Sequence, residues 1–429
     1  MITLGIETSC DETALALIET RNNGGAFECR VISSLINSQA ELHSAYGGVF
    51  PTLAKREHGK NLLPLLKRLL EESSNDAVFR EKEDISVAAE DRNQPSLRKL
   101  PKERSSFSEV LESFHTEIGS NNPDLWESFK DADFLKDIPP IDRIAVTEGP
   151  GLEPALWVGI NFARMISALW SIPVIPVNHM EGHIVGSLLD QEKAVQRSWQ
   201  ALKALKFPAV ALLISGGHTE LVRIEKASER ASGMFGRLHY SVIGRTKDDA
   251  VGEAFDKAAR LLGLPYPGGP RISGLSAEAK EKGIVSTVKL PRPMLHSHSL
   301  DFSFSGLKTA VLYAVRDNTR PDGTLDDAFK KGLAREFEEA VAETLETKLK
   351  SAIEDISARS MIVGGGVSAN KMLRERFMAI SKEYDIPIYL PSQHISGDNA
   401  LMIALAGALD ADDHTDALKA HGTKRLGNI

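Results

Sequence analysis

The sequence predicts an α/β protein with two lobes of similar construction and a cleft between them. Three observations predict this fold class. Apolar segments typical of β-strands alternate with longer segments that have helical periodicity. The stretches GIETSCDETALALIE and LLISGGHTELVRIE both fit strand, short turn and strand, as two copies of one unit would, although chance explains two such hairpins equally well. The length of 429 residues corresponds to about two or three domains.

The individual elements follow from local patterns. Runs of aliphatic and β-branched residues bounded by turn residues predict strands at 2–7, 14–19, 143–147, 174–177, 209–214, 220–224, 361–363 and 386–390. Apolar residues spaced three and four apart predict helices at 54–72, 155–170, 179–189, 248–262, 325–353, 371–384 and 398–408. The expected organisation is a first lobe at 1–178, a second lobe at 179–397, a helix at 398–410 that returns to the first lobe, and a polar tail at 411–429.

One segment of the first lobe breaks this alternation. Residues 73–137 are polar, rich in Ser, Glu and Lys, and carry no aliphatic strand pattern. Residues 71–138 hold 17 acidic and 9 basic side chains, so they account for the whole formal net charge of −8. Within the segment, SEVLESFHTE would form one or two amphipathic turns. We expect a solvated, flexible insertion; a partner-docking arm is the alternative.

Composition excludes several classes of protein. The chain is 42% hydrophobic and 26% charged, which suffices for a core without disulfide or metal staples. Two cysteines, Cys10 and Cys29, make no disulfide framework and suit a reducing compartment. We see neither a signal peptide nor an apolar run of about 18 residues, and therefore expect a cytoplasmic protein without a membrane span. Outside residues 71–138 the chain has no formal net charge, which neither predicts nor excludes an RNA partner.

The sharpest motif is His179-Met-Glu-Gly-His183. On a helix the two histidines would lie one turn apart on one face, so that both imidazoles can share a metal ion. Two surface histidines at a helix start, capped by Asn178, explain the motif about equally well. Zinc proteases place a general base directly after the first histidine. Glu181 would be rotated about 200° from His179, so a metalloprotease is a weak alternative.

Asp398 is the best candidate for a third metal ligand. It precedes the apolar helix ALMIALAGAL, where a carboxylate suits the positive end of the helix dipole. A plain N-cap is the ordinary alternative for this residue. Two neutral imidazoles and one carboxylate leave coordination positions open, as a catalytic or substrate-binding metal requires. The residues alone do not choose between iron and zinc.

Glycine-rich turns after strand-like runs favour a nucleotide-type ligand. They lie at 214–219, 266–270 and 363–370, and their backbone N–H groups can approach a phosphate or a ribose. Tight connections between elements are the alternative for each turn. None fits a P-loop or a Rossmann fingerprint. Asp256, on an acid-rich helix, would receive ribose hydroxyls or an amine unless it is part of a solvated face, and no motif makes Cys10 a nucleophile.

Together these runs resemble the bacterial-type TsaD family of tRNA threonylcarbamoyladenosine synthases. The resemblance covers nearly all of the chain except the insertion and the last ~20 residues, and a chance match of so many ordered motifs is improbable. The matching stretches, in family order, are GIETSCDET, TEGPGLEPALWVG, HMEGH, ALLISGGHTEL, DDAVGEAFDKAARLLGLPYPGGP, DFSFSGLKTAV, VGGGVSANKMLRERF and SGDNALMIA.

The resemblance implies the actin-like fold of sugar kinases and Hsp70-type ATPases, duplicated in two lobes. It implies transfer of threonylcarbamoyl from threonylcarbamoyl-AMP to the adenosine beside the anticodon of tRNAs that read codons starting with A. The implied ligands of one divalent ion are His179, His183 and Asp398, with Fe²⁺ favoured and Zn²⁺ as the alternative. The implied binding positions for an adenylate or ATP-type ligand in the cleft are Leu213, Ile214, Ser215, Gly216, Gly217, Asp256, Gly269 and Asn370.

The resemblance also implies tRNA and the partner subunits TsaB and TsaE as partners, and no catalytic nucleophile. Because no basic stripe is evident, we expect tRNA capture to need the partner subunits. Two departures stand out: the insertion is longer than the family's usual connection, and Asn178 stands where many relatives have histidine. A metalloprotease and an ATP-hydrolysing scaffold that acts through partners are the competing functions.

Overall fold

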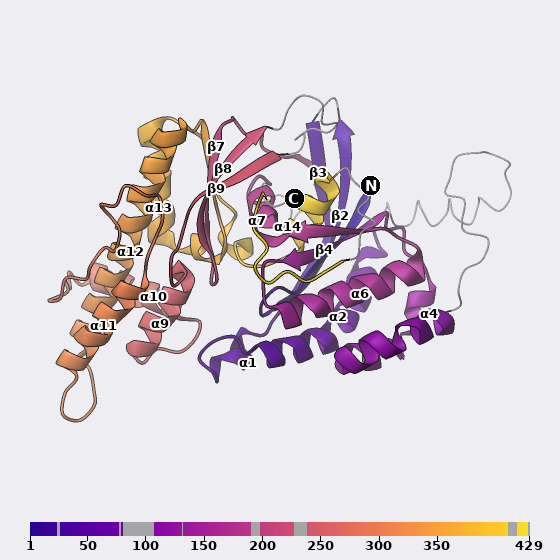
Figure 1. Cartoon of the computed structure of the whole chain (residues 1–429), viewed down its shortest axis with the longest axis horizontal. Helices are drawn as coiled ribbons and strands as arrows, with labels where there is room; N and C mark the ends of the chain where they lie inside the picture. Colours follow the sequence, from indigo (N-terminus) through magenta and orange to yellow (C-terminus); the bar gives the residue numbers. More distant parts are fainter. Residues whose placement is uncertain are drawn as a thin grey trace.

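The computed structural model describes residues 1–23, 26–76, 79, 107–130, 132–189, 198–226, 238–410 and 418–427. Two lobes, each built on a twisted sheet, lie side by side (Figure 1). The first sheet has the strand order β5-β4-β1-β2-β3-β6. Its strands are β1 (Ile2–Glu7), β2 (Glu12–Asn23), β3 (Ala26–Ser38), β4 (Arg143–Gly149), β5 (Val174–Asn178) and β6 (Gln200–Ala201).

The second sheet repeats this plan. Its order is β11-β10-β7-β8-β9. Its strands are β7 (Ala209–Ile214), β8 (Thr219–Lys226), β9 (Leu238–Arg245), β10 (Ser360–Gly364) and β11 (Ile388–Tyr389). In both sheets an antiparallel three-strand meander is followed by two strands parallel to the first. The chain therefore has the duplicated α/β fold that the sequence predicted, with the sheet plan of the actin-like fold that the resemblance implied.

Helices cover the outer faces of both sheets. In the first lobe these are α1 (Ala40–Ser44), α2 (Pro51–Ser73), α4 (Phe107–Phe114), α5 (Pro123–Lys130) and α6 (Glu153–Trp170), with short turns at His115–Gly119 and Asp133–Lys136. In the second lobe they are α9 (Val251–Leu261), α10 (Gly268–Glu281), α11 (Ser305–Asn318), α12 (Asp327–Ile356) and α13 (Lys371–Tyr384), with 3-10 turns at Gly366–Ala369 and Gln393–Ile395. Each lobe has its own apolar cluster beneath these helices.

Two further helices occupy the middle of the molecule (Figure 1). α7 (His179–Gly186) follows the last strand of the first repeat, and α14 (Ala400–Leu409) follows the last strand of the second. They pack against each other and share one apolar cluster with residues of both sheets. α14 is apolar around its whole circumference and buried except at its last residue, as a helix enclosed on all sides should be. Its contacts with β1, β2 and β4 tie the second repeat to the first sheet.

The insertion differs from its prediction. Residues 107–130 and 132–136 form α4, α5 and the adjoining turns, and pack on the first lobe instead of forming a flexible segment. The prediction of flexibility is wrong here because sparse apolar side chains (Ile118, Leu125 and Phe129) are fully buried in the first lobe's cluster. Residues 77–78 and 80–106 of the insertion lie outside the described residues.

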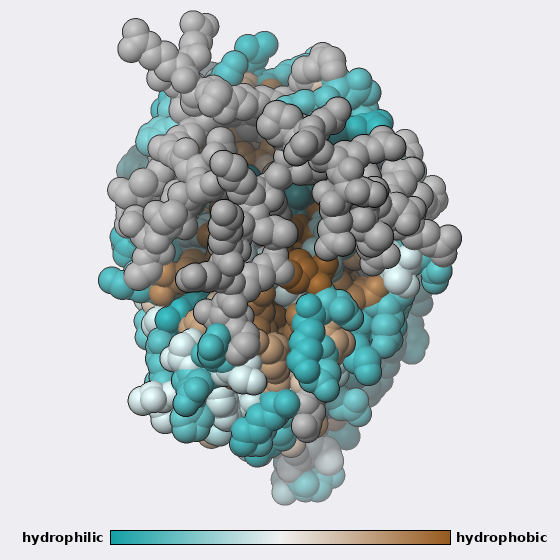
Figure 2. Space-filling view, turned by 90° about the vertical axis from the view of Figure 1, so that its right-hand side faces the viewer, coloured by the Kyte–Doolittle hydropathy of each residue, from teal (hydrophilic) through white to brown (hydrophobic). Residues whose placement is uncertain are grey.

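None of the helices that the structure describes is long and apolar enough to cross a membrane. Figure 2 shows the end of the molecule formed by the first lobe, where hydrophobic residues reach the surface among hydrophilic ones. Solvent-exposed large hydrophobic residues of the first lobe include Ile36, Leu42, Tyr46 and Phe50.

Candidate metal and nucleotide site

The three predicted metal ligands meet where α7 and α14 begin. His179 and His183 lie one turn apart on α7, with ring centroids 4.7 Å apart. The Asp398 Oδ1 atom lies 3.3 Å from His179 Nε2 and 3.2 Å from His183 Nε2. One ligand atom from each residue falls within 4.8 Å of the other two. Residues more than 200 positions apart thus form one compact, largely buried cluster.

Helix caps explain how the ligands are placed. Asn178 accepts hydrogen bonds from the backbone N–H groups of Met180 and Glu181, so α7 begins at His179. At α14 the cap is Asn399, whose side chain accepts from Met402 N at 3.0 Å. The alternative that Asp398 is only an N-cap is therefore wrong. Its carboxylate is free of that role and turns toward the histidines.

Glu7 orients His179. Its Oε2 atom lies 3.0 Å from His179 Nδ1 and accepts a hydrogen bond of 2.6 Å from the Thr147 hydroxyl. Burial acts to raise the pKa of Glu7, but the adjacent imidazole outweighs it, so the pKa is lowered and the fully buried side chain is a carboxylate. A carboxylate on Nδ1 favours the tautomer that presents the Nε2 lone pair to an ion. The sequence analysis missed this residue, although it ends the first predicted strand.

The pKa values of the two imidazoles shift in opposite directions: His183 stays neutral, whereas the proton favoured on His179 would have to leave before an ion binds. Burial lowers the pKa of His183 and keeps the ring neutral. Burial also opposes protonation of His179, but Asp398 and Glu7 outweigh it and raise that pKa. The buried Nε2 of His183 has no regular hydrogen bond among the described residues, although Asp398 Oδ1 lies 3.2 Å away. A cation bound by both His183 Nε2 and the Asp398 carboxylate would satisfy this ring nitrogen.

Glu181 faces away from this cluster, as the helical rotation predicted. Its Oε1 atom accepts a hydrogen bond of 3.0 Å from the Tyr240 hydroxyl on β9. Burial raises the pKa of both groups. Glu181 therefore joins α7 to the second sheet, and is not placed to act as the general base of a metalloprotease.

The predicted nucleotide-binding residues all belong to the second lobe. Leu213 and Ile214 end β7, and the turn after them is closed by a hydrogen bond from His218 N to the Ser215 hydroxyl. Gly252 N, at the start of α9, donates to the Ser215 carbonyl, which places this turn against α9. These contacts bring the 213–217 segment to the helix that carries Asp256.

Asp256, Gly269 and Asn370 gather around the first turns of α10. Asp256 accepts a hydrogen bond of 2.7 Å from Gly268 N, and its pKa is raised mainly by burial. Asn370 caps α13 through its carbonyl, while its amide donates to Ser273 on α10 and to Glu338. The structure thus brings these three positions together, but it engages both ends of the Asn370 side chain within the lobe.

The glycines of these turns fall into two groups. A Cβ on Gly365, where φ is +91°, would lie 2.4 Å from the Ile214 carbonyl oxygen, and one on Gly268 would lie 2.7 Å from Asp256 Cα. The fold itself needs glycine at these two positions. By contrast, no atom beyond chain neighbours lies within 4 Å of a Cβ at Gly216, Gly217 or Gly269. The open space beside those three glycines is available to a ligand.

Two residues that the sequence analysis did not assign connect the lobes near this site. The Tyr266 hydroxyl, in the α9–α10 connection, lies 3.5 Å from the Asp11 carboxylate in the turn after β1. Asp11 also acts electrostatically on Asp256 and so helps to raise its pKa. Turns of both lobes therefore face each other beside the binding positions.

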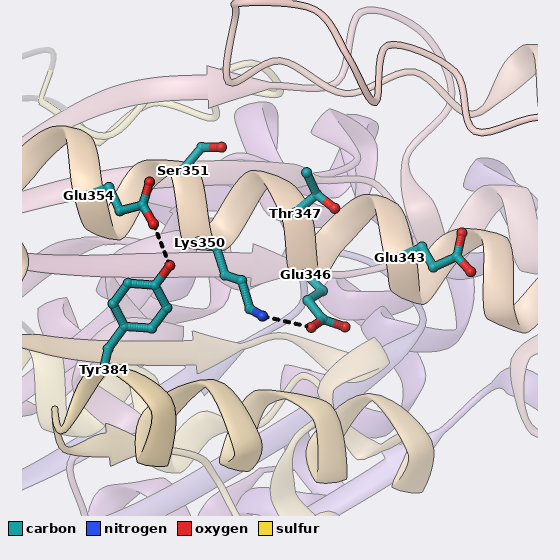
Figure 3. Close-up of a pocket in the computed structure, with 7 residues that line it drawn as sticks. All are labelled: Glu343, Glu346, Thr347, Lys350, Ser351, Glu354 and Tyr384. Carbon is teal, nitrogen blue, oxygen red and sulfur yellow. Dashed lines mark hydrogen bonds and ion pairs between the residues drawn. The ribbon is translucent and has the colours of Figure 1, made fainter.

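Surface grooves elsewhere contain none of these residues. A groove of about 430 Å³ follows α12 and the end of α13, and two pairs of its lining side chains contact each other (Figure 3). Lys350 lies 3.1 Å from Glu346, and the Tyr384 hydroxyl donates to Glu354, which raises the pKa of Tyr384 to about 12. A second groove of about 350 Å³ lies between α2 and the start of α5.

Comparison with known proteins agrees with the sequence motifs. A family model described as tRNA N6-adenosine threonylcarbamoyltransferase matches residues 30–89 and 127–405. A protein of that name from Chromobacterium violaceum is 35% identical over 409 residues, covering 95% of this chain and 93% of its own length. One from Paraburkholderia xenovorans is 37% identical over 409 residues, covering 95% and 92%.

Among solved structures, component A of (R)-2-hydroxyglutaryl-CoA dehydratase from Acidaminococcus fermentans is similar, with a TM-score of 0.42 and 10% identity over 95% of this chain and 96% of its own. The family match extends through both lobes and includes every predicted metal and nucleotide position. This chain belongs to the tRNA N6-adenosine threonylcarbamoyltransferase family.

Proposed function

We propose that this transferase joins threonylcarbamoyl to N6 of the adenosine beside the anticodon, in tRNAs that read codons starting with A, at a divalent ion held by His179, His183 and Asp398. Threonylcarbamoyl-AMP is the proposed donor. One observation carries the proposal: three ligand atoms converge within 4.8 Å, and one of them, His183 Nε2, is buried without a hydrogen bond. Fe²⁺ is the favoured ion and Zn²⁺ the alternative.

The residues of the chain suit this ion. Two imidazoles and a carboxylate leave coordination positions open, so a bound ion would supply Lewis-acid stabilisation of developing negative charge. Glu7 holds the His179 tautomer, and Thr147 holds Glu7 in turn. Burial keeps His183 neutral and ready to bind.

The second lobe offers a binding surface for the adenylate. Backbone N–H groups of the Ser215–Gly217 turn can approach a phosphate, because no neighbour fills the space at Gly216 and Gly217. Asp256, which lies on α9 and accepts a hydrogen bond from Gly268 N at the start of α10, is the proposed acceptor for ribose hydroxyls. Asn370 supports this surface by fixing α13 to α10 through Ser273.

The chemistry requires positioning more than an enzyme nucleophile. The adenine amine is a weak nucleophile, and the mixed anhydride with AMP makes the carbamoyl carbon electrophilic. A C–N bond forms to N6 as the C–O bond to the phosphate of AMP breaks and N6 releases a proton to solvent. The protein must therefore align the reactants and stabilise the leaving phosphate. Cys10 is no candidate nucleophile, because burial and the adjacent Asp11 raise the pKa of its thiol well above the usual value.

Partners complete the proposal. We propose that tRNA is captured together with the subunits TsaB and TsaE, in the cytoplasm, where the free thiols of Cys10 and Cys29 would stay reduced. Tight tRNA binding by the isolated chain at physiological salt would contradict the need for partners.

A transfer assay tests the function. Unmodified tRNA and threonylcarbamoyl-AMP are incubated with the chain and its partner subunits, and nucleosides are read by mass spectrometry. We expect modified adenosine from the wild type and from the control His239→Ala, whose side chain is exposed on β9, and a loss of about a hundred-fold or more in His183→Ala. Equal product from all three would exclude an essential ion. No product with active partners would favour the ATP-hydrolysing scaffold.

A further inference from the structure

The C-terminal residues 418–427, here called the strap, contact both lobes. Figure 1 shows this segment (yellow) as an extended trace that crosses the middle of the molecule. Leu418 and Ala420 pack on the apolar cluster of the first lobe. Leu426 is buried in the central cluster that both sheets share with α7 and α14. The sequence predicted only a polar tail here, and the family match ends at residue 405.

The first attachment of the strap is to the end of β4 and the loop that joins β4 to α6. His421 N donates to the Glu148 carbonyl at 2.8 Å, and Gly151 N donates to the Gly422 carbonyl at 3.2 Å. The Lys424 ammonium pairs with the Glu148 carboxylate, whose side chain is 10% exposed. A Cβ on Gly149 would lie 2.0 Å from the His421 carbonyl oxygen. The two backbones are therefore in direct contact, with no room for a side chain between them.

The same segment supports the metal cluster from its other side. Leu152 N donates to the Ser9 carbonyl at 2.8 Å, and the Ser9 hydroxyl lies 3.3 Å from His179 Nδ1. Gly149 is paired in the sheet with Asn178, whose side chain caps α7. The segment held by the strap therefore reaches His179 by two routes, each through a single residue. One route passes through Ser9 and the other through Asn178.

The second attachment of the strap is to β9. Gly427 has φ of +82°, and a Cβ there would lie 2.4 Å from the Tyr240 carbonyl oxygen. The Tyr240 hydroxyl donates to Glu181, which lies between the two histidines on α7. The strap thus contacts the partners of α7 in both lobes.

We propose that the strap is a positioning element for the metal-binding helix, with Lys424 as its principal positioning residue. By joining the end of β4 and the β4–α6 loop to β9, it holds α7 at the place where His179 and His183 meet Asp398 across the interface of the two repeats. The inference rests on the proposed function of these three residues. It assigns to the C-terminal segment a part in the reaction, although none of its residues is proposed to touch substrate.

The test compares Lys424→Met with the conservative Lys424→Arg and with a control, Lys382→Met, whose side chain is exposed on α13. Zn²⁺ affinity is measured by competition with a chromophoric chelator, and transfer is measured in a single turnover with saturating tRNA. We expect Lys424→Met to weaken Zn²⁺ binding and to slow transfer, each by about ten-fold. Lys424→Arg should recover most of both, and the control should match the wild type.

Deletion of residues 421–429 gives a second test that does not depend on one ion pair. The deleted chain should show both defects more strongly, and a synthetic peptide of residues 418–429 should restore Zn²⁺ affinity and transfer. Lower thermal stability with unchanged Zn²⁺ affinity and transfer in Lys424→Met would overturn the inference and leave the strap a purely structural clamp. If the wild type binds Zn²⁺ but transfers nothing, the proposed function fails instead, and the Zn²⁺ measurements still decide on the strap.

Discussion

At the residue scale, the proposed metal site depends on a carboxylate, Glu7, that is not one of its three proposed ligands. Glu7 is fully buried, contacts His179 Nδ1 at 3.0 Å and is held by Thr147. We predict that Glu7→Gln weakens Zn²⁺ binding by about 10- to 100-fold, because an amide no longer fixes the tautomer of His179. Chelator competition measures the affinity, with the exposed Glu41→Gln as a control. An affinity equal to that of the wild type would show that Glu7 only packs.

The candidate site could be predicted from the sequence only where its residues are local or typical. His179 and His183 were predicted because the i, i+4 spacing of two histidines is visible in five letters. Asp398 was predicted from its place before an apolar helix. Glu7 was not, because 172 positions separate it from His179 and no periodicity reports such a contact. The contact between Asp11 and Tyr266 joins residues of different lobes and was missed for the same reason.

At the element scale, strands and helices were predictable when one clear pattern fills them. β1 and β7 have the predicted bounds, because all six residues of each are buried; β7 is wholly apolar, and β1 has an aliphatic residue at every second position. β3 was missed, since its sequence AFECRVISSLINS mixes polar residues into a half-exposed strand near the sheet edge. α10 was missed as well, because it begins with Gly268, Gly269 and Pro270, which are typical of a turn.

The glycine turns give a matched pair of variants at this scale. We predict that Gly365→Ala lowers the free energy of unfolding by about 2 kcal/mol or more, because φ is +91° and the Cβ would meet a carbonyl oxygen. Gly216→Ala should unfold like the wild type, because the space at that position is open. Urea unfolding measures both variants.

The same pair separates ligand binding from folding. If an adenylate approaches the open turn, Gly216→Ala should weaken binding of AMP about ten-fold while leaving stability intact. Isothermal calorimetry with AMP measures this affinity. Normal AMP binding in Gly216→Ala would place the adenylate elsewhere than at this turn.

At the scale of the whole molecule, the stability of the chain should depend on a buried neutral histidine. The His58 Nε2 atom lies 3.1 Å from the Cys10 carbonyl oxygen, and Nδ1 lies 2.8 Å from the Thr13 hydroxyl and 3.2 Å from the Gln39 amide. Burial lowers the pKa of His58 from 6.5 to about 4. His58 therefore binds a proton less readily in the folded chain than in the unfolded chain.

The lowered pKa of His58 makes the folded chain less stable in acid. Between about pH 6.5 and pH 4 the unfolded chain binds more protons, so acid favours unfolding through this group by up to about 1.4 kcal/mol per pH unit. We predict that wild-type stability falls more steeply from pH 7 to pH 5 than that of His58→Gln. Urea unfolding at several pH values measures both slopes, and parallel slopes would exclude His58 as the cause.

The ion is proposed to bind where α7, which follows the last strand of the first repeat, meets the start of α14, which follows the last strand of the second. Transfer by metal-stripped chain titrated with Fe²⁺, in the wild type and in Asp398→Asn, tests this site. We predict almost no transfer without metal, a rise that saturates at about one ion per chain, and little recovery in Asp398→Asn. Full transfer by the stripped chain, or equal recovery in the variant, would contradict this prediction.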